Sequence, residues 1–490
     1  MADRIIPGVS ITVVREVVPR PLGATGVLGI VGPAEIDASA ERLVALGSVQ
    51  EFRDRFGPGS LAAMPEVAQA FANGLNQVVV ANLPEGKAGN KARLALPANG
   101  GSLALFVEAR APGAWANQLH VTVMSKPGST ADRAIDVEVR KGGEILERFS
   151  SLSAQAGNAR CFYDVLHRES AYVHVVTGPG TLPVVVDGTL VIPDNNPAAQ
   201  LPQGFSVVPD SAVVSGPMAG GTDALLSAYV EALTRLENFE DVDMVTVSHS
   251  YGTSSLNTVK QLWAAVRAHC DKMSRIARNR MGYGQVPAPL AKAAPDIGMA
   301  QDLSQVLTSE RFVLTAPHGY LGAVIGMVSA LPYYFSPTFK TLPAVADLSF
   351  DFTDPQLEAL LKNGVCAVDM VPRHGVAVVK GITTDAGQIN VTRVADRAVR
   401  VVQNIAQDFI GLLNTQDQRL ALQQRIVEAF TVMEREQAIV PSTDGKSPAF
   451  QVAVGSSQAD FAAGIVRVDI AVRPVRAIDY IYATINVKAF

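Results

Sequence analysis

Hydrophobic residues alternate with polar ones near both ends of the chain, as they do in β-strands that bury one face. Close to the N-terminus the alternating apolar positions are Val9, Ile11, Val13 and Val17. The alternation recurs from 466 to 472, and beyond Pro474 a last segment is apolar on both faces. Its apolar positions are Ile478, Tyr480, Ile481, Tyr482, Ile485 and Val487. Prolines separate both end segments from their neighbours, so we predict two linker arms, residues 1–20 and 477–490, whose strands pair elsewhere.

Between the arms, strand-like and helix-like patterns alternate. From 21 to 89 the pattern reads strand, helix, helix, strand, and from 210 to 385 it resumes with helices and strands in turn. Such alternation is typical of a wound sheet. Residues 90–209 instead carry many Gly, Pro and Ser residues with short Val-rich runs. We therefore predict a multidomain α/β protein (α+β mixed), with a wound core in two parts, 21–89 and 210–385, and an inserted outer β-rich domain, 90–209.

Two amphipathic helices are predicted in a C-terminal inner domain, 386–476. The first carries apolar residues at three- to four-residue spacing, namely Val394, Val401, Ile405, Phe409 and Leu412. The second begins at a capping-box match of Thr415 with Gln418 and carries Leu422, Ile426, Phe430 and Met433. Each helix should therefore bury one face, next to the strand at 466–472.

Composition favours a subunit of an assembly. The 490 residues exclude a single small domain, and the net charge of −5 offers no basic field to hold nucleic acid or an anionic membrane. Hydrophobic residues make up 48% of the chain and charged residues only 18%, with a mean hydropathy of +0.20. This balance leaves apolar surface for subunit contacts.

One long stretch, 312–339, lacks formal charges, but six prolines and glycines divide it. Each piece is too short to span a bilayer as one helix, so we predict no direct membrane insertion. The first residues lack the apolar stretch of a signal peptide, so secretion by that route is not expected.

Candidate chemistry is sparse. Ser250 follows a predicted strand, as the serine of a nucleophile elbow does, but Ser248 stands where that motif has its first glycine. Val440 likewise stands where a P-loop ending in Lys446 and Ser447 needs a glycine. The cysteines are far apart in sequence and indicate neither a disulfide framework nor a zinc site; they are Cys161, Cys270 and Cys366. We predict no catalytic residue, no cofactor and no metal.

Several short segments, in order along the chain, carry a family resemblance. The first are Pro7-Gly8-Val9 and Gly29-Ile30-Val31-Gly32, and the most distinctive is the stretch around Gly113, Trp115 and Asn117. Further matches are Gly220 to Asp223, Ser336 to Lys340, Gly381 to Thr384, and Ile389 to Val391. Two positions depart from the pattern, because Ala116 and Ala224 replace glycines. In this order the segments resemble the contractile tail sheath proteins of bacteriophages and related contractile injection systems.

The resemblance implies a non-enzymatic mechanical subunit. Six copies would form a ring, and rings would stack helically around a tail tube, between a baseplate and a tail terminator. The sheath would contract once, without nucleotide fuel, and drive the tube through a host envelope. The implied location is the virion tail or injection particle, assembled in the cytoplasm of the bacterial host.

The resemblance also places the C-terminal domain nearest the tube. Arginines on its helices are then candidates to face the tube; they are Arg393, Arg397, Arg400, Arg419, Arg425 and Arg435. A solvated helix face explains them equally well. Two other functions stay open, a non-contractile structural oligomer such as a tube or capsid component, and a serine hydrolase that uses Ser250.

Overall fold

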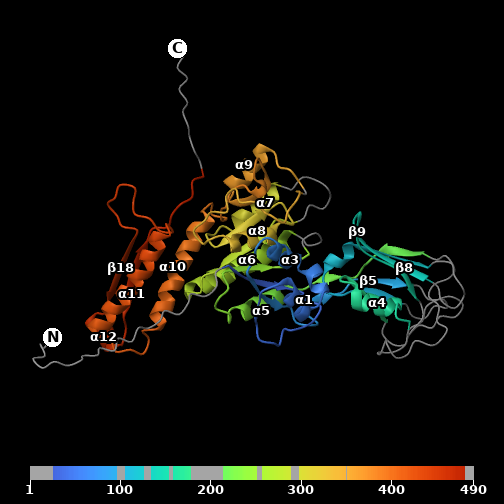
Figure 1. Cartoon of the computed structure of the whole chain (residues 1–490), viewed down its shortest axis with the longest axis horizontal. Helices are drawn as coiled ribbons and strands as arrows, with labels where there is room; N and C mark the ends of the chain where they lie inside the picture. Colours follow the sequence, from blue (N-terminus) through green and yellow to red (C-terminus); the bar gives the residue numbers. More distant parts are fainter. Residues whose placement is uncertain are drawn as a thin grey trace, which may run out of the picture. The chain divides into compact units, whose positions relative to one another are not determined.

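The computed structural model describes residues 26–96, 105–125, 134–153, 158–177, 213–250, 256–287, 297–348 and 350–479. These residues form two compact units. Arg397–Arg473 makes up the smaller unit, and the remaining described residues make up the larger one. Figure 1 shows the elements of both units and labels most of the helices.

The larger unit is built on a wound sheet. Its described residues give eight strands in the order β17-β16-β15-β14-β13-β1-β3-β2. The strands are β1 (Val27–Gly32), β2 (Ala45–Leu46), β3 (Gln77–Asn82), β13 (Met244–Val247), β14 (Met281–Gln285), β15 (Phe312–Ala316), β16 (Val365–Val371) and β17 (Gly375–Val378). The inner strands run parallel, and β2 and β17 flank them antiparallel. The predicted α/β class is thus confirmed.

Helices cover both faces of this sheet. They are α1 (Val49–Phe56), α2 (Gly59–Ala63), α3 (Pro65–Ala72), α5 (Leu226–Leu236), α6 (Leu256–Arg275), α7 (Ile297–Val306), α8 (Leu321–Ala330) and α9 (Asp354–Lys362). Helices α3 and α8 pack against each other, while α5, α6, α7 and α9 form a second group. Right-handed crossovers from β1 to β3 and from β13 to β14 place α3 and α6 on opposite faces. Helix α8 follows β15 and lies on the α3 face, so the connection from β15 to β16 contributes helices to both faces.

The uncharged stretch 312–339 is part of this core. It supplies β15 and the buried helix α8, whose Gly322 and Gly326 allow close packing on α3. A Cβ atom on Gly326 would lie 2.1 Å from the carbonyl oxygen of Ala70. In the described part of the chain, no helix combines the length and the apolarity needed to cross a membrane.

The region predicted as an insertion consists mainly of short strands with their own apolar core. Its elements are β4 (Gly89–Asn90), β5 (Arg93–Leu96), β6 (Leu105–Ala109), η1 (Ala114–Gln118), β7 (Leu119–Ser125), β8 (Ala134–Lys141), β9 (Glu144–Ser153), α4 (Phe162–Glu169), β10 (Val173–Thr177), β11 (Val213–Pro217) and β12 (Thr222–Asp223). Residues such as Val121, Val137 and Leu166 form the core. Because β11 pairs with β7, the β-rich region extends to Pro217, beyond the predicted boundary at 209.

Two segments of the family resemblance meet where this region returns to the sheet. The side-chain amide of Asn117 donates to the carbonyl oxygen of Gly221 at 2.8 Å and accepts from the amide of the same residue at 2.9 Å. Asp223 accepts a hydrogen bond from the amide of Ala114 at 2.9 Å. These contacts join two stretches about a hundred positions apart. Two segments that carry the family resemblance are therefore in contact in the folded chain.

The C-terminal region contains α10 (Ile389–Gln407), α11 (Gln416–Arg435), β18 (Phe450–Gly455), α12 (Gln458–Ala462) and β19 (Arg467–Val472). The predicted apolar face of α11 is confirmed, because Leu422, Ile426, Phe430 and Met433 are buried. The predicted end of the preceding helix is wrong. Helix α10 ends at Gln407, and Phe409 and Leu412 lie in the following turns, where Gly411 has a left-handed φ of 89°.

Candidate functional site

The smaller unit contains a pair of antiparallel strands, which is too few strands for a stable independent sheet. Strand β18 pairs with β19 in register from Phe450 opposite Val472 to Gly455 opposite Arg467. Among the described residues these two strands pair only with each other. A two-stranded sheet is marginally stable in water and presents unpaired main-chain groups at its outer edges. Its geometry therefore suits the addition of further strands.

One side of this sheet is held by α11. The rings of Phe430 and Phe450 lie 5.5 Å apart in an edge-to-face arrangement, and Gln423 donates to the carbonyl oxygen of Val452 at 3.2 Å. The loop between the strands is fixed by Asp460, which forms the capping box of α12 with Ser457 and accepts three hydrogen bonds from the Arg467 guanidinium. These bonds lower the pKa of Asp460 to about 2. These contacts hold the two strands in place.

Exposed apolar side chains lie next to the strand pair β18–β19. Ile410 and Leu413, between α10 and α11, are 80% and 79% exposed. They border a cavity of about 290 Å³ that reaches Val466, just before β19, and Val468 in β19. Exposed aliphatic side chains around a cavity are typical of a surface that another chain covers.

The candidate arginines occupy different environments. Arg393 is turned inward in the larger unit, where it donates to the carbonyl oxygens of Leu331 and Pro332. In the smaller unit Arg419 donates to Asn414, and Arg435 is exposed at the end of α11. The side chains of Arg397, Arg400 and Arg425 are half-buried. Contact of these residues with a tube stays a prediction.

The residues of the N-terminal arm, Val9, Ile11, Val13 and Val17, lie outside the described residues, as do Tyr480, Ile481, Tyr482, Ile485 and Val487. The root of the C-terminal arm is described. Gln388 donates to the carbonyl oxygen of Ala477 at 3.1 Å and accepts from its amide at 2.9 Å. Asp479 accepts from Gln388 at 2.9 Å and lies 3.6 Å from the ammonium of Lys380. Ile478, between them, is 79% exposed.

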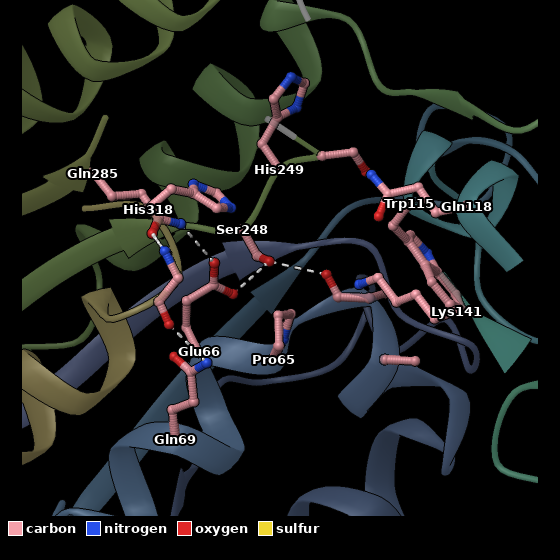
Figure 2. A pocket seen from close by; sticks show the side chains of 14 residues that line it. Pro65, Glu66, Gln69, Trp115, Gln118, Lys141, Ser248, His249, Gln285 and His318 are labelled. Atoms are coloured by element: carbon pink, nitrogen blue, oxygen red, sulfur yellow. Dashed lines mark hydrogen bonds between the residues drawn. The ribbon is translucent and has the colours of Figure 1, made fainter. Parts of the chain in front are cut away.

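A polar pocket of about 250 Å³ lies in the larger unit, where β13 and β14 end. Figure 2 shows Glu66 from α3 and Ser248 meeting inside it, with Lys141 reaching in from the side of Trp115. The Ser248 hydroxyl lies 2.7 Å from a carboxyl oxygen of Glu66 and 2.9 Å from the carbonyl oxygen of Ala63. Glu66 was not among the residues predicted for a site, although a single acid within an apolar helix signals a buried carboxyl.

Ser250, the candidate nucleophile, lines the same pocket and is half-buried. Two histidines line the same pocket. His249 contacts Tyr229 at 3.1 Å and lies 3.6 Å from Asp223, and His318 bonds to the carbonyl oxygen of Val286 at 3.1 Å. Burial lowers the pKa of both histidines. The carboxyl group of Glu66 contacts Ser248 in this pocket.

Among the described residues, no group of three or more His, Cys, Asp or Glu side chains is arranged so that it could hold a metal ion. The three cysteines are buried free thiols.

Comparison with known proteins agrees with the sequence resemblance. The tail sheath protein of Bacillus phage SP01 is 26% identical over 231 residues, which cover 41% of this chain and 37% of that protein. The chain therefore matches little more than a third of the length of this relative. No protein-family model matches the chain.

Solved structures match along nearly the whole chain. The sheath of the extracellular contractile injection system PVC, in its contracted state, has a TM-score of 0.56 at 9% identity and covers 99% of this chain and 98% of its own. The contracted helical sheath of the anti-feeding prophage has a TM-score of 0.54 at 12% identity, with 98% and 99% covered. The sheath tail protein of Listeria innocua has a TM-score of 0.51 at 14% identity, with 93% of each chain covered.

The chain therefore has the fold of contractile tail sheath proteins. The resemblance predicted from its sequence is confirmed.

Proposed function

We propose that this protein is a structural subunit of a contractile tail sheath in a phage tail or a related injection particle. The observation that carries the proposal is the likeness to contracted sheath subunits over nearly the whole chain. Hexameric rings of the subunit would stack around a tail tube, between a baseplate and a tail terminator. The sheath would assemble in the bacterial cytoplasm. Its role is mechanical rather than catalytic.

Contraction in this proposal needs no nucleotide. The extended sheath is a metastable assembly, and contraction releases free energy stored in its subunit interfaces. A large conformational change of this kind requires that neighbouring subunits stay linked while they move. Covalent links are not needed, because strands exchanged between subunits supply main-chain hydrogen bonds that survive rotation of the bodies they connect.

The open strand pair β18–β19 is the acceptor for such strands in our proposal. Both of its outer edges offer main-chain donors and acceptors, and its half-buried face carries apolar side chains. The N-terminal segment, with Val9, Ile11 and Val13 on one face, has the matching alternation. The segment after Asp479 is apolar on both faces and suits a position inside a completed sheet. Each subunit would thus give two strands and receive two.

The arginines of α11 and the β-rich region also have roles in this proposal. The arginines of α11, with Arg419 and Arg425 half-buried and Arg435 exposed, would face an acidic tube surface. The β-rich region between residues 90 and 209 would decorate the outside of the sheath. It has its own apolar core, separate from that of the wound sheet.

Negative-stain electron microscopy of the purified chain tests the proposal. We expect long, hollow, ridged cylinders of variable length. Assemblies of one fixed length would instead favour a non-contractile oligomer. Labelling of Ser250 by a serine-directed probe would favour the hydrolase and contradict a purely mechanical role.

A matched pair of substitutions tests the strand exchange. Ile11→Asp places a charge on the apolar face of the predicted arm strand, and Thr12→Asp places the same charge on its opposite face. We expect Ile11→Asp, like deletion of residues 1–18 or 477–490, to leave a folded subunit that forms no cylinders. Thr12→Asp should assemble normally. Equal assembly by both variants would contradict the role of the arm.

A further inference from the structure

The pocket at Glu66 occupies the position in the sheet where open α/β proteins bind ligands. Strand β1 lies between β3 and β13, and the chain winds away from it in both directions. The carboxyl ends of strands beside such a reversal leave a crevice. Here Ser248 follows β13, Gln285 ends β14 and His318 follows β15, and all three line the cavity of about 250 Å³.

The hydrogen bonds around Ser248 favour a protonated Glu66. The Ser248 hydroxyl carries one proton, yet it lies 2.9 Å from the carbonyl oxygen of Ala63 and 2.7 Å from Oε2 of Glu66. With Glu66 ionised, this one proton has to serve two acceptors. With Oε2 protonated, Glu66 donates to Ser248 and Ser248 donates to Ala63, so both contacts are full hydrogen bonds. Oε1 of Glu66 remains an acceptor, 3.4 Å from the amide nitrogen of Gln285.

The surroundings agree with a neutral acid. The Glu66 side chain is enclosed, with 4% of the residue exposed, and its side-chain hydrogen-bond partners, Ser248 and Gln285, are both neutral. Burial raises the pKa of Glu66 from 4.5 to about 7. An ionised carboxylate would be far more stable here beside a positive charge.

The other titratable groups near the pocket leave Glu66 as the one that changes charge near neutral pH. Burial lowers the pKa of His249 and of His318, so both are neutral. Burial also raises the pKa of Tyr229, which keeps its hydroxyl protonated. Lys141, at the end of β8, stands exposed on the far side of the pocket and supplies a positive charge there (Figure 2).

We propose that this pocket binds a short amino acid, whose ammonium group rests against the Glu66 carboxylate and whose carboxylate faces Lys141. The ligand ammonium provides the missing positive charge, and Gln285 and Ser248 stay as hydrogen-bond partners of Glu66. On binding, Glu66 releases its proton to solvent. The volume restricts the ligand to a small solute, since drug-sized ligands occupy pockets of about 300–1,000 Å³. The inference is independent of sheath assembly.

Proton release makes the proposal measurable by calorimetry. Glycine, β-alanine and 4-aminobutyrate are the probes, and ethylamine and acetate are their single-charge counterparts. We expect one of the amino acids to bind at least about tenfold more tightly than ethylamine or acetate. Its affinity should be about tenfold lower at pH 6 than at pH 8, because Glu66 must lose a proton whose pKa is about 7. The heat at pH 6 should vary with the ionisation enthalpy of the buffer, as one released proton requires.

Three variants distinguish binding in this pocket from effects of a substitution elsewhere in the protein. Glu66→Gln keeps the size and hydrogen bonds of the side chain but cannot ionise, and should lose the binding and the proton release. Lys141→Gln should reduce the preference for amino acids over ethylamine. Glu358→Gln, on the exposed face of α9, makes the same chemical change elsewhere and should bind as the unaltered protein does. The proposal is overturned if no amino acid binds, if Glu66→Gln binds equally well while folded, or if binding releases no proton.

Discussion

Ser248 and Glu66 lie 182 positions apart in sequence and share one short hydrogen bond. Their contact has a consequence for stability, because a buried acid that keeps its proton titrates differently after unfolding. Between pH 4.5 and about 7 the folded protein holds a proton on Glu66 that the unfolded chain has released. Wherever the folded state binds more protons, stability falls as pH rises.

We therefore expect the free energy of unfolding to decrease by about 3 kcal/mol through Glu66 as the pH rises from 4.5 to 8. Glu66→Gln should remove this part of the slope and be more stable than the unaltered protein at pH 8. Urea denaturation at pH 5 and pH 8 measures both quantities. Glu358→Gln is the control, and equal slopes for Glu66→Gln and the unaltered protein would contradict a neutral buried Glu66.

At the scale of elements, the root of the C-terminal arm is held by side chains that imitate a neighbouring strand. Gln388 engages both main-chain groups of Ala477, and Asn390 donates to the carbonyl oxygen of Val475 at 3.1 Å. An amide side chain can replace a strand edge in this way because it presents a donor and an acceptor side by side. The arm therefore leaves the larger unit at a defined point, just after Asp479.

Gln388→Ala should release this point without unfolding the unit. It leaves the main-chain groups of Ala477 without their partner, at a cost of about 1–3 kcal/mol. We expect hydrogen exchange at the Ala477 amide to accelerate at least about tenfold, while exchange in β15 stays unchanged. Gln424→Ala, on the exposed side of α11, is the matched control. Unchanged exchange at Ala477 would show that the clamp does not hold the arm.

At the scale of the whole molecule, the proposed grip on the tube depends on many weak contacts. Exposed ion pairs contribute about 0–1 kcal/mol each, so a sheath would gain its hold from repetition over subunits. We expect Arg419→Glu combined with Arg425→Glu to hinder co-assembly with the tube, or to loosen the extended sheath as salt rises, with the subunit still folded. Lys446→Glu, exposed in the same unit, is the control. Co-assembly that is unchanged at every salt concentration would assign these arginines to solvent.

The β-rich region allows a second test at this scale. Replacement of residues 90–208 by a short linker should change the diameter of the cylinders more than their formation, if the region decorates the outside. The linker must leave Gly89 free to pair with Asp223, because this pairing of β4 with β12 lies directly before the replaced segment. Electron microscopy of the assembled variant gives the diameter. Density for this region against the tube wall, in cylinders of the unaltered chain, would refute the placement.

Periodicity along the sequence predicted a wound sheet and the face of α11 that is buried. The alternation of strand-like and helix-like patterns in 21–89 and 210–385 predicted the sheet, and the spacing of Leu422, Ile426 and Phe430 predicted the packed face of α11. These features are local, because side-chain direction repeats every two residues in a strand and every 3.6 in a helix. The family resemblance rested on segments in sequence order and needed no contacts.

Only the tertiary structure decided which polar groups meet. Glu66 with Ser248, Asn117 with Gly221 and Gln388 with Ala477 are pairs whose members lie 182, 104 and 89 positions apart. Their meeting depends on strand order and on where loops return, which local periodicity does not encode. The apolar spacing also did not predict where α10 ends. It continues past Gln407, whereas the helix stops there and the left-handed Gly411 lies in the turn that follows. Burial then set the chemistry of Glu66, since a carboxyl group keeps its proton near neutral pH only where the folded chain excludes water around it.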